Sequence, residues 1–247
     1  MIPFEDPSTL SLLYHLNSEP WLNTEAYQAS AYEVEYRTAA RPEAALALPM
    51  TPPSPLHTLF EERCSCRGYQ ARAMPLATVA ALLSAAYGLG RKAWFPDQTS
   101  YLCRSVPSAG GLYPLELFVL TQRVEGAADG LHHYDVWNHV LEPVVDRPVF
   151  EDFRPAMPAY PFVQEANVLF FLAAVFMRTQ KKYGPRGYRY VLLEAGHSAQ
   201  NLCLSAAHAG LGSLCIGGFF DTQVNRLLRL DTTKEGVVYA VGVGYPA

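Results

Sequence analysis

Lys182 and Tyr183 are adjacent residues that could together remove a proton from carbon. A tyrosine is a weak base by itself, but a neighbouring ammonium group favours its phenolate form. Adjacent side chains diverge on a strand, so these two can serve one site only from a loop or a helix end. The following Gly184 and Pro185 supply such an end. The pair is therefore a candidate for general acid–base catalysis, with a charged surface loop as the alternative.

A run of small residues offers a surface on which a flat ligand could lie. Its members are Pro107, Ser108, Ala109, Gly110 and Gly111. With so little side-chain bulk, a ligand can approach the main chain and use its N–H groups. Gly217 and Gly218 offer N–H groups in the same way ahead of a helix. An ordinary tight turn is the alternative for the first run, and a strand-to-helix turn for the second.

The segment Arg63-Cys64-Ser65-Cys66-Arg67 holds residue types that bind phosphate. If the preceding helix continues through it, Arg63 and Arg67 lie four residues apart and share a face. Two guanidinium groups and a serine hydroxyl would then form a phosphate cradle. A solvated basic turn paired with Glu61 or Glu62 is the alternative.

Polar residues also form a stripe along the longest expected helix. They are Glu194, His197, Asn201 and His208. Such residues must be hydrogen-bonded if they are buried, and they could form a proton relay, a metal site or a network at a dimer interface. The network is favoured because no set of carboxylates and histidines has complete metal-ligand spacing, so no metal is expected.

Hydrophobic periodicity and turn residues predict the elements that position these segments. Helices are expected from residue 56 to near Cys64 and over residues 8–17, 76–87, 190–211 and 222–230. Asp221 or Thr222 would cap the last of them. Strands are expected over residues 115–121, 168–177 and 237–243, with a hairpin over residues 130–142. The run 168–177 is continuously apolar, which is typical of a central strand buried on both faces.

The loose alternation of helices and strands favours an α+β fold. Residues 38–55 hold five prolines among alanines, so residues 1–55 are expected to form an N-terminal extension or arm. Residues 56–247 would form one domain, which is a suitable length for a single core.

Composition limits the partners and the compartment. Half of the 247 residues are hydrophobic, 17% are charged, and the net charge is -4 without any block of like charges. These values allow a large core or oligomer interface and argue against binding nucleic acid. No apolar run reaches the about 20 residues that span a membrane, and the start has no signal-peptide pattern. The five cysteines lack zinc-site spacing, so the chain is expected in a reducing cytoplasm.

Five motifs follow one another in a recognisable order between about residues 56 and 245. They are Arg-x-Ser-x-Arg, Pro-Ser-Ala-Gly-Gly-Leu-Tyr-Pro, Lys-Tyr-Gly-x-Arg-Gly-Tyr-Arg, Leu-Leu-Glu-Ala-Gly-His-x-x-Gln-Asn-Leu and Ile-Gly-Gly-Phe-x-Asp. Each motif is weak alone, but in this order they are jointly specific. The chain resembles the FMN-dependent nitroreductase-like superfamily. More narrowly, it is similar to the azoline-dehydrogenase branch, the SagB/McbC-type oxidoreductases and the oxidase domains of nonribosomal peptide synthetases.

The resemblance implies a mostly antiparallel sheet flanked by helices, and an intertwined homodimer that binds FMN at its interface. The FMN phosphate and ribityl chain would be held by Arg63, Cys64, Ser65 and Arg67. The isoalloxazine would lie along Pro107, Ser108, Ala109, Gly110 and Gly111, and a backbone N–H at Gly217 or Gly218 would face its N5. Gln200 and Asn201 would lie near the cofactor on the dimer helix. Lys182 and Tyr183 match the adjacent pair that does the chemistry in azoline-oxidising members.

The implied activity is FMN-dependent oxidation of a peptide-derived thiazoline or oxazoline to the azole in natural-product biosynthesis. Residues before 55 are too few to form a large domain that clamps a peptide. A small free substrate or one tethered to a carrier protein is therefore as compatible with the sequence as a long leader peptide. In many superfamily members a basic residue from a C-terminal segment also binds the phosphate. This chain is expected to lack that residue, so binding of the phosphate would depend more on Arg63 and Arg67. The alternatives are an NAD(P)H-dependent nitro or ene reductase, another peptide-desaturating flavoenzyme, and a non-catalytic subunit.

Overall fold

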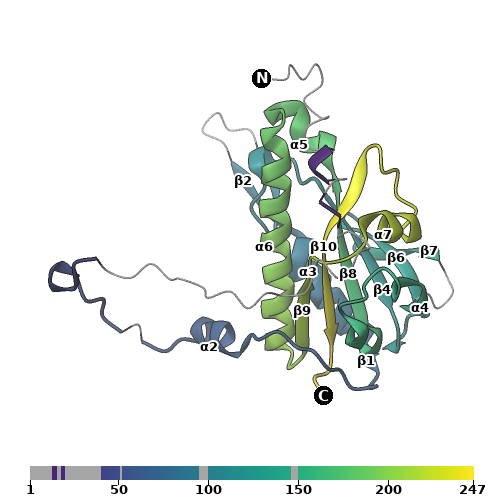
Figure 1. Ribbon diagram of the computed structural model, residues 1–247, viewed down its shortest axis with the longest axis horizontal. Helices are drawn as coiled ribbons and strands as arrows, with labels where there is room; N and C mark the ends of the chain where they lie inside the picture. The colour runs from purple at the N-terminus through teal and green to yellow at the C-terminus, as the bar shows by residue number, and fades with distance from the viewer. Residues whose placement is uncertain (1–12, 16–17, 20–39, 51, 95–99, 146–149) are drawn as a thin grey trace.

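A six-stranded antiparallel sheet forms the centre of the computed structural model, which describes residues 13–15, 18–19, 40–50, 52–94, 100–145 and 150–247 (Figure 1). The strand order is β7-β6-β4-β8-β10-β9, and each neighbouring pair is antiparallel. The strands are β4 (Leu115–Thr121), β6 (Gly130–Asp135), β7 (Val140–Val145), β8 (Val168–Val175), β9 (Gly212–Ile216) and β10 (Glu235–Gly244). The α+β fold with a mostly antiparallel sheet is confirmed.

Helices lie on both faces of this sheet. α3 (Leu76–Tyr87) and α6 (Arg186–His208) cover one face, and α4 (Phe150–Phe153) and α7 (Asp221–Leu227) cover the other. α5 (Phe176–Tyr183) joins β8 to α6, and α2 (Pro55–Glu62) precedes the sheet. The remaining elements are the paired strands β2 (Leu89–Trp94) and β3 (Ser100–Arg104), the parallel pair β1 (Met74–Pro75) and β5 (Val124–Glu125), and the 3-10 turns η2 (Pro42–Ala44), η3 (Ala109–Gly111) and η4 (Pro161–Glu165).

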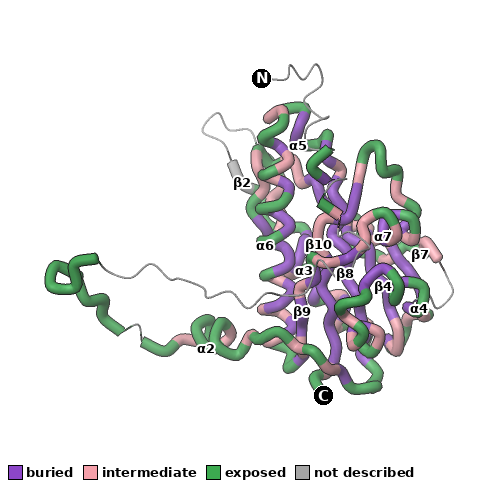
Figure 2. The backbone as a smooth tube through the Cα atoms, in the orientation of Figure 1, coloured by how far each residue is buried: buried purple, intermediate pink, exposed green. Residues whose placement is uncertain are grey.

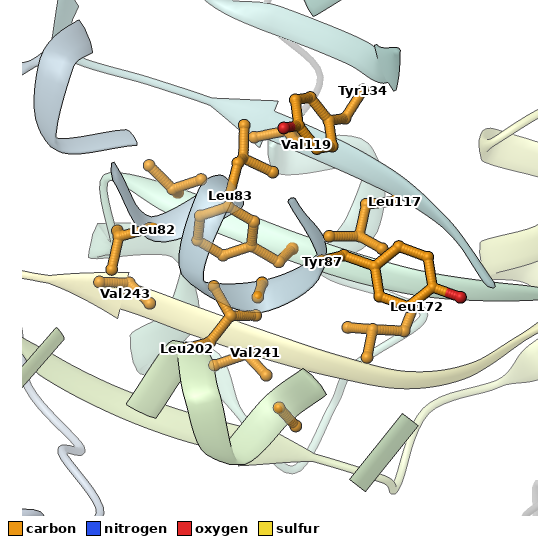
Figure 3. Close-up of a cluster of buried hydrophobic side chains, with 14 of the residues drawn as sticks. Leu82, Leu83, Tyr87, Leu117, Val119, Tyr134, Leu172, Leu202, Val241 and Val243 are labelled. Carbon is orange, nitrogen blue, oxygen red and sulfur yellow. The ribbon is translucent and has the colours of Figure 1, made fainter. Parts of the chain in front are cut away.

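Strand β8 is buried on both faces, as its apolar run predicts. Successive side chains on a strand point to opposite faces, so Phe170 joins the cluster under α3 and α6, while Phe171 joins the cluster under α4 and α7. Figure 3 shows the first cluster, in which Leu83, Tyr87 and Leu202 pack against the strands. Each fully buried side chain of this size contributes about 1.5–3 kcal/mol relative to exposure.

The predicted strand over residues 168–177 is too long by two residues. The chain leaves the sheet at Val175, whose N–H donates to the carbonyl of Pro114, and α5 begins at Phe176. Phe176 is itself buried, so the apolar run continues past the point where the backbone changes from strand to helix. Hydrophobicity alone does not mark that boundary.

Residues 40–50 and 52–62 extend away from the sheet as an arm (Figures 1 and 2). Leu46, Leu48 and Met50 are 84–94% exposed, and α2 contains no buried residue. The compact region was expected to begin near Pro55, and the first buried residue along residues 52–94 is Tyr69. The division into an extension over residues 1–55 and a domain over residues 56–247 stays a prediction.

Two short described pieces before the arm contact the sheet domain. The His15 ring packs edge-on against Phe176, with centroids 5.3 Å apart. Glu19 accepts hydrogen bonds from the backbone N–H (2.9 Å) and the hydroxyl (2.8 Å) of Thr222. The cap expected from Asp221 or Thr222 is therefore wrong, because the carboxylate that satisfies this helix start comes from a distant residue. Of the helix expected over residues 8–17, only 13–15 are described, and they are helical; the rest lies outside the described residues.

Candidate active site

The small-residue run forms a fixed turn, which we call the shelf (residues 107–111). Gly110 and Gly111 both have a φ of +66°, a left-handed conformation that favours glycine. The hydroxyl of Ser108 accepts a hydrogen bond from the N–H of Tyr113 at 2.9 Å. The hydroxyl of Tyr113 in turn accepts from the N–H of Arg104 at 2.9 Å, which ties β3 to the shelf. The shelf is therefore held from both ends.

Buried polar residues of α3 and α6 hold the shelf from behind. The Tyr87 hydroxyl donates to Glu194 at 2.6 Å and accepts from the N–H of Leu115 at 3.1 Å. Burial raises the pKa of the Glu194 carboxyl above its ordinary value. The Asn201 amide donates to the carbonyls of Ala85 (3.0 Å) and Ser105 (3.2 Å). Two residues of the predicted polar stripe are thus hydrogen-bonded within one chain, and their expected place at a dimer interface stays a prediction.

The structure brings Lys182 and Tyr183 to the shelf. A Cβ on Gly110 would lie 2.8 Å from the Lys182 Nζ and 2.7 Å from the Tyr183 Oη. The Lys182 Nζ lies 5.4 Å from the centre of the Tyr183 ring. The side chains therefore converge on one point although their residues are adjacent, because α5 ends at Tyr183.

The turn between α5 and α6 explains why this helix end faces the shelf. Gly184 has a φ of +57°, and its N–H donates to the carbonyl of Gln180 at 2.8 Å. Gly187 lies so close to the backbone of Gln180 that a Cβ would approach within 2.9 Å. A short, glycine-dependent turn thus reverses the chain directly after Tyr183.

Arg63, Cys64, Ser65 and Arg67 lie on an extended segment that follows α2, so the condition that the helix continues through them is not met. α2 ends at Glu62, and the N–H of Cys66 donates to the carbonyl of Ser213 at 2.9 Å, next to a bridge between Ser65 and Ser213. Pairing with β9 satisfies the backbone in place of helical bonds. Alternate residues of an extended segment share a side, so Arg63, Ser65 and Arg67 can still act together as a cradle.

The charge of this cradle is not neutralised by the nearby acids. Among the residues that the structure describes, no ion pair forms between Arg63 or Arg67 and an acidic side chain. The alternative drawn from the sequence, in which these arginines pair with Glu61 or Glu62, is not observed among the ion pairs of the described residues. Both guanidinium groups remain available to an anion.

The predicted site residues fall into two groups at opposite ends of α6. The shelf and the pair Lys182 and Tyr183 lie toward its start, whereas the cradle lies beside β9, which follows its end (Figure 1). With 23 residues, α6 is about 34 Å long. β9 then leads back to Gly217 and Gly218, and Gln200 is exposed on α6. One chain therefore does not bring the cradle and the pair together.

Two adjoining cavities border the shelf. The first has a volume of about 610 Å³ and is lined by Tyr101, Arg104, Ser108, Gly110 and Gly111, among others. The second, of about 530 Å³, shares Tyr101, Arg104 and Gly111 with the first and extends to Glu116, His133 and Arg178. Both volumes fall in the range of about 300–1,000 Å³ that is typical of small-molecule sites.

The polar cluster of the second cavity was missed in the sequence. Glu116 binds Arg178 and accepts from the His133 Nε2 at 3.0 Å. Burial opposes ionisation of Glu116, but hydrogen bonds from His133 and Arg178 hold the pKa of its carboxyl below its ordinary value. Two signals were available. Glu116 interrupts an otherwise apolar strand, and Arg178 lies one helical turn before Lys182.

Arg104 was also passed over, although it lies three residues before the shelf. Its guanidinium carbon lies 4.4 Å from the centre of the Tyr87 ring and 5.0 Å from that of Tyr113. Stacking on two rings fixes the position of this cation between the two cavities. The position of Arg104 becomes visible only in the folded structure, where Tyr87 of α3 packs against it.

Comparison with known proteins defines the class to which this fold and site belong. Residues 60–245 match the nitroreductase family, and the chain therefore belongs to that family. The chain is 33% identical over 189 residues to MJ1384 of Methanocaldococcus jannaschii, an alignment that covers 76% of this chain and 90% of that protein. The resemblance seen in the ordered motifs is confirmed.

The relatives include a peptide-processing protein. The chain is 30% identical over 141 residues to the microcin B17-processing protein McbC of Escherichia coli, and it spans about half of that relative's length (55% of this chain, 52% of McbC). A chain of the E. coli microcin synthetase McbBCD complex with truncated pro-MccB17 bound has the same fold, with a TM-score of 0.70 and 23% identity over 98% of this chain and 94% of that one. A nitroreductase in complex with FMN from Desulfovibrio desulfuricans also shares the fold, with a TM-score of 0.55 and 18% identity over 79% and 88%.

Proposed function

We propose that this chain is an FMN-dependent oxidase that converts a peptide-derived thiazoline or oxazoline to the corresponding azole in natural-product biosynthesis. The observation that carries this proposal is the convergence of Lys182 and Tyr183 on Gly110, at 2.8 and 2.7 Å from a Cβ position. A pair able to transfer a proton thus borders a surface on which a flat ring could lie. The similarity to McbC supports a peptide-derived substrate.

The described residues fit FMN in both charge and shape. Arg63 and Arg67, which form no ion pair with the acidic residues that the structure describes, offer positive charge to a phosphate. Gly110 and Gly111 add no side chains of their own to the shelf, and a cavity of about 610 Å³ borders it. FMN, when bound there, would supply the acceptor for a hydride from the substrate, with dioxygen as the final oxidant.

The distance between the two groups of residues supports a homodimer in which each site is shared. The pair precedes α6, which is about 34 Å long, whereas the cradle pairs with β9 after this helix. We therefore expect one copy to hold the FMN phosphate and the other to supply the shelf, Lys182 and Tyr183. Leu192 and Leu193 on α6 are 39% and 54% exposed, and a second copy would cover them.

Lys182 and Tyr183 would act on the substrate in one step. The Tyr183 oxygen would take the acidic Cα proton of the azoline ring, with the positive charge of Lys182 beside the Tyr183 ring. Loss of that proton and of a hydride from the neighbouring carbon makes the ring aromatic. Arg178 and Glu116 line a second cavity one helical turn from Lys182, which gives space for the remainder of the substrate.

The partners and the location follow from the same proposal. We expect a small free substrate or one tethered to a carrier protein, and no nucleic-acid or membrane partner. None of the helices in the described part of the chain is both long enough and apolar enough to cross a bilayer. A cytoplasmic location stays a prediction from the sequence.

The second candidate is an NAD(P)H-dependent reductase of nitro or enone compounds. Membership of the nitroreductase family favours it. Such a reductase would use the same cradle and shelf, but its reaction would not require Lys182 or Tyr183.

Anaerobic mixing separates the candidates. The FMN-loaded protein is expected to lose its flavin absorbance on addition of a thiazoline-containing peptide, free or carrier-bound, and the peptide is expected to lose two hydrogens. NADPH is expected to leave the flavin oxidised. Bleaching by NADPH but not by the thiazoline would favour the reductase, and a colourless protein that does not take up FMN would contradict both candidates.

A further inference from the structure

Cys203 on α6 and Cys215 on β9 form a pair of thiols that the proposed reaction does not use. Their Sγ atoms lie 3.5 Å apart. Cys203 is buried, and Cys215 is half-buried. A disulfide requires a sulfur–sulfur distance of about 2.0 Å, so a movement of about 1.5 Å would join them. Among the residues that the structure describes, no other two cysteine sulfurs are in hydrogen-bonding contact.

Cys215 is the thiol of this pair that peroxide can reach more easily, because it is half-buried whereas Cys203 is buried. The sulfurs of Cys203 and Cys215 share a hydrogen bond at 3.5 Å in which either thiol can be the donor, and Tyr239 and Arg63 also interact with Cys215. These groups hold the pKa of the Cys215 thiol below its ordinary value, although its burial acts in the opposite direction. The thiolate is the form that attacks peroxides.

The pair lies between the two segments expected to hold the flavin on one chain. Ser213, two residues before Cys215, is bridged to Ser65 in the cradle. Gly217, two residues after Cys215, has the Tyr239 ring as the nearest group to its Cβ position, at 3.8 Å. Hydrogen peroxide, which reduced flavin produces with dioxygen, would therefore arise close to these thiols.

We propose that Cys203 and Cys215 are a peroxide-reactive dithiol that closes to an intramolecular disulfide. The Cys215 thiolate attacks one oxygen of hydrogen peroxide, the O–O bond breaks, and Cys215 becomes a sulfenic acid as hydroxide leaves. The sulfur of Cys203 then attacks the sulfur of Cys215, the S–O bond breaks, and the Cys203 proton leaves with that oxygen as water. Two thiols are oxidised to a disulfide, and one peroxide is reduced to two waters.

The other three cysteines provide an internal comparison. Cys64 is exposed and Cys103 is half-buried. Cys66 donates its S–H to the carbonyl of Gly68 at 3.1 Å. If exposure alone decided, peroxide would oxidise Cys64 first. If the contact between two thiols decides, peroxide oxidises Cys215 first.

Peroxide treatment followed by alkylation and peptide mapping tests this proposal on the full-length protein. Cys203 and Cys215 lie on one tryptic peptide, residues 190–226. After one equivalent of hydrogen peroxide, that peptide is expected to resist alkylation at both positions and to weigh two hydrogens less. The other three cysteines are expected to remain alkylated.

Two variants complete the test. Cys103→Ser should still form the disulfide, whereas Cys203→Ser should lose it completely and leave a sulfenic acid on Cys215 that dimedone traps. Preferential oxidation of Cys64, or full alkylation of peptide 190–226 in the wild-type protein, would overturn the proposal. This experiment uses neither FMN nor an azoline. A failure to form the disulfide can therefore be told apart from a failure to oxidise an azoline.

Discussion

Lys182→Ala and Tyr183→Phe are each expected to reduce azoline oxidation by roughly 10²–10⁴-fold, the usual contribution of general acid–base catalysis. Tyr183→Phe removes the oxygen that would accept the Cα proton. Lys182→Ala removes the positive charge beside the Tyr183 ring, so turnover should fall even though Tyr183 is present. Steady-state rates with a thiazoline-containing peptide give the measurement.

A structural effect must be separated from this chemical effect. Both variants should keep wild-type FMN affinity, because neither residue belongs to the cradle. Lys181→Ala is the matched control, since Lys181 is exposed on the same helix and adjacent to the pair. Its turnover should be unchanged. Full oxidation by both Lys182→Ala and Tyr183→Phe would remove the pair from the mechanism.

Gly110→Ala is expected to lower turnover by about 10²-fold, because small displacements of catalytic groups have effects of this size. The new methyl group would occupy space 2.7 Å from the Tyr183 Oη and 2.8 Å from the Lys182 Nζ, so both side chains must move. The positive φ of Gly110 also destabilises alanine there by about 1 kcal/mol.

Gly111→Ala isolates the backbone effect. Gly111 has the same φ of +66°, but its Cβ would meet only the Tyr101 ring at 3.8 Å, an ordinary contact. Both variants should therefore lose similar thermal stability, and Gly110→Ala should show the larger loss of turnover. Equal losses of turnover would mean that the pair does not need its contact with the shelf.

Local signals predicted most of the fold. The helix over residues 76–87 and the strand over residues 115–121 were predicted with the observed bounds, because each has a strong periodicity or β-propensity and clear ends. α6 was found but begins four residues earlier than predicted. Pro185 immediately precedes the observed start, and proline is compatible with a helix beginning.

The failures come from interactions between residues that are distant in the sequence. The helix predicted to end near Cys64 ends at Glu62, and the segment beyond it, where a helical continuation would have aligned Arg63 and Arg67, pairs with β9. The cap of α7 comes from Glu19, about 200 residues away. No local pattern contains either contact.

The candidate site was predicted as separate motifs, and their arrangement required the fold. Residue types alone indicated Lys182, Tyr183 and the shelf, and nothing in their spacing showed that they meet at Gly110. The separation of the cradle from the pair by α6 was likewise invisible before the topology was known. The assigned roles of all these residues stay predictions.

A mixed dimer tests most directly whether two copies share one flavin site. One chain would carry Arg63→Ala and Arg67→Ala, the other Lys182→Ala and Tyr183→Phe, with different affinity tags so that only mixed dimers are purified. Each double variant alone should be inactive. A shared site predicts about half of wild-type azoline oxidation, because one of the two sites receives an intact cradle and an intact pair. Purified mixed dimers that are as inactive as either parent would contradict the shared site.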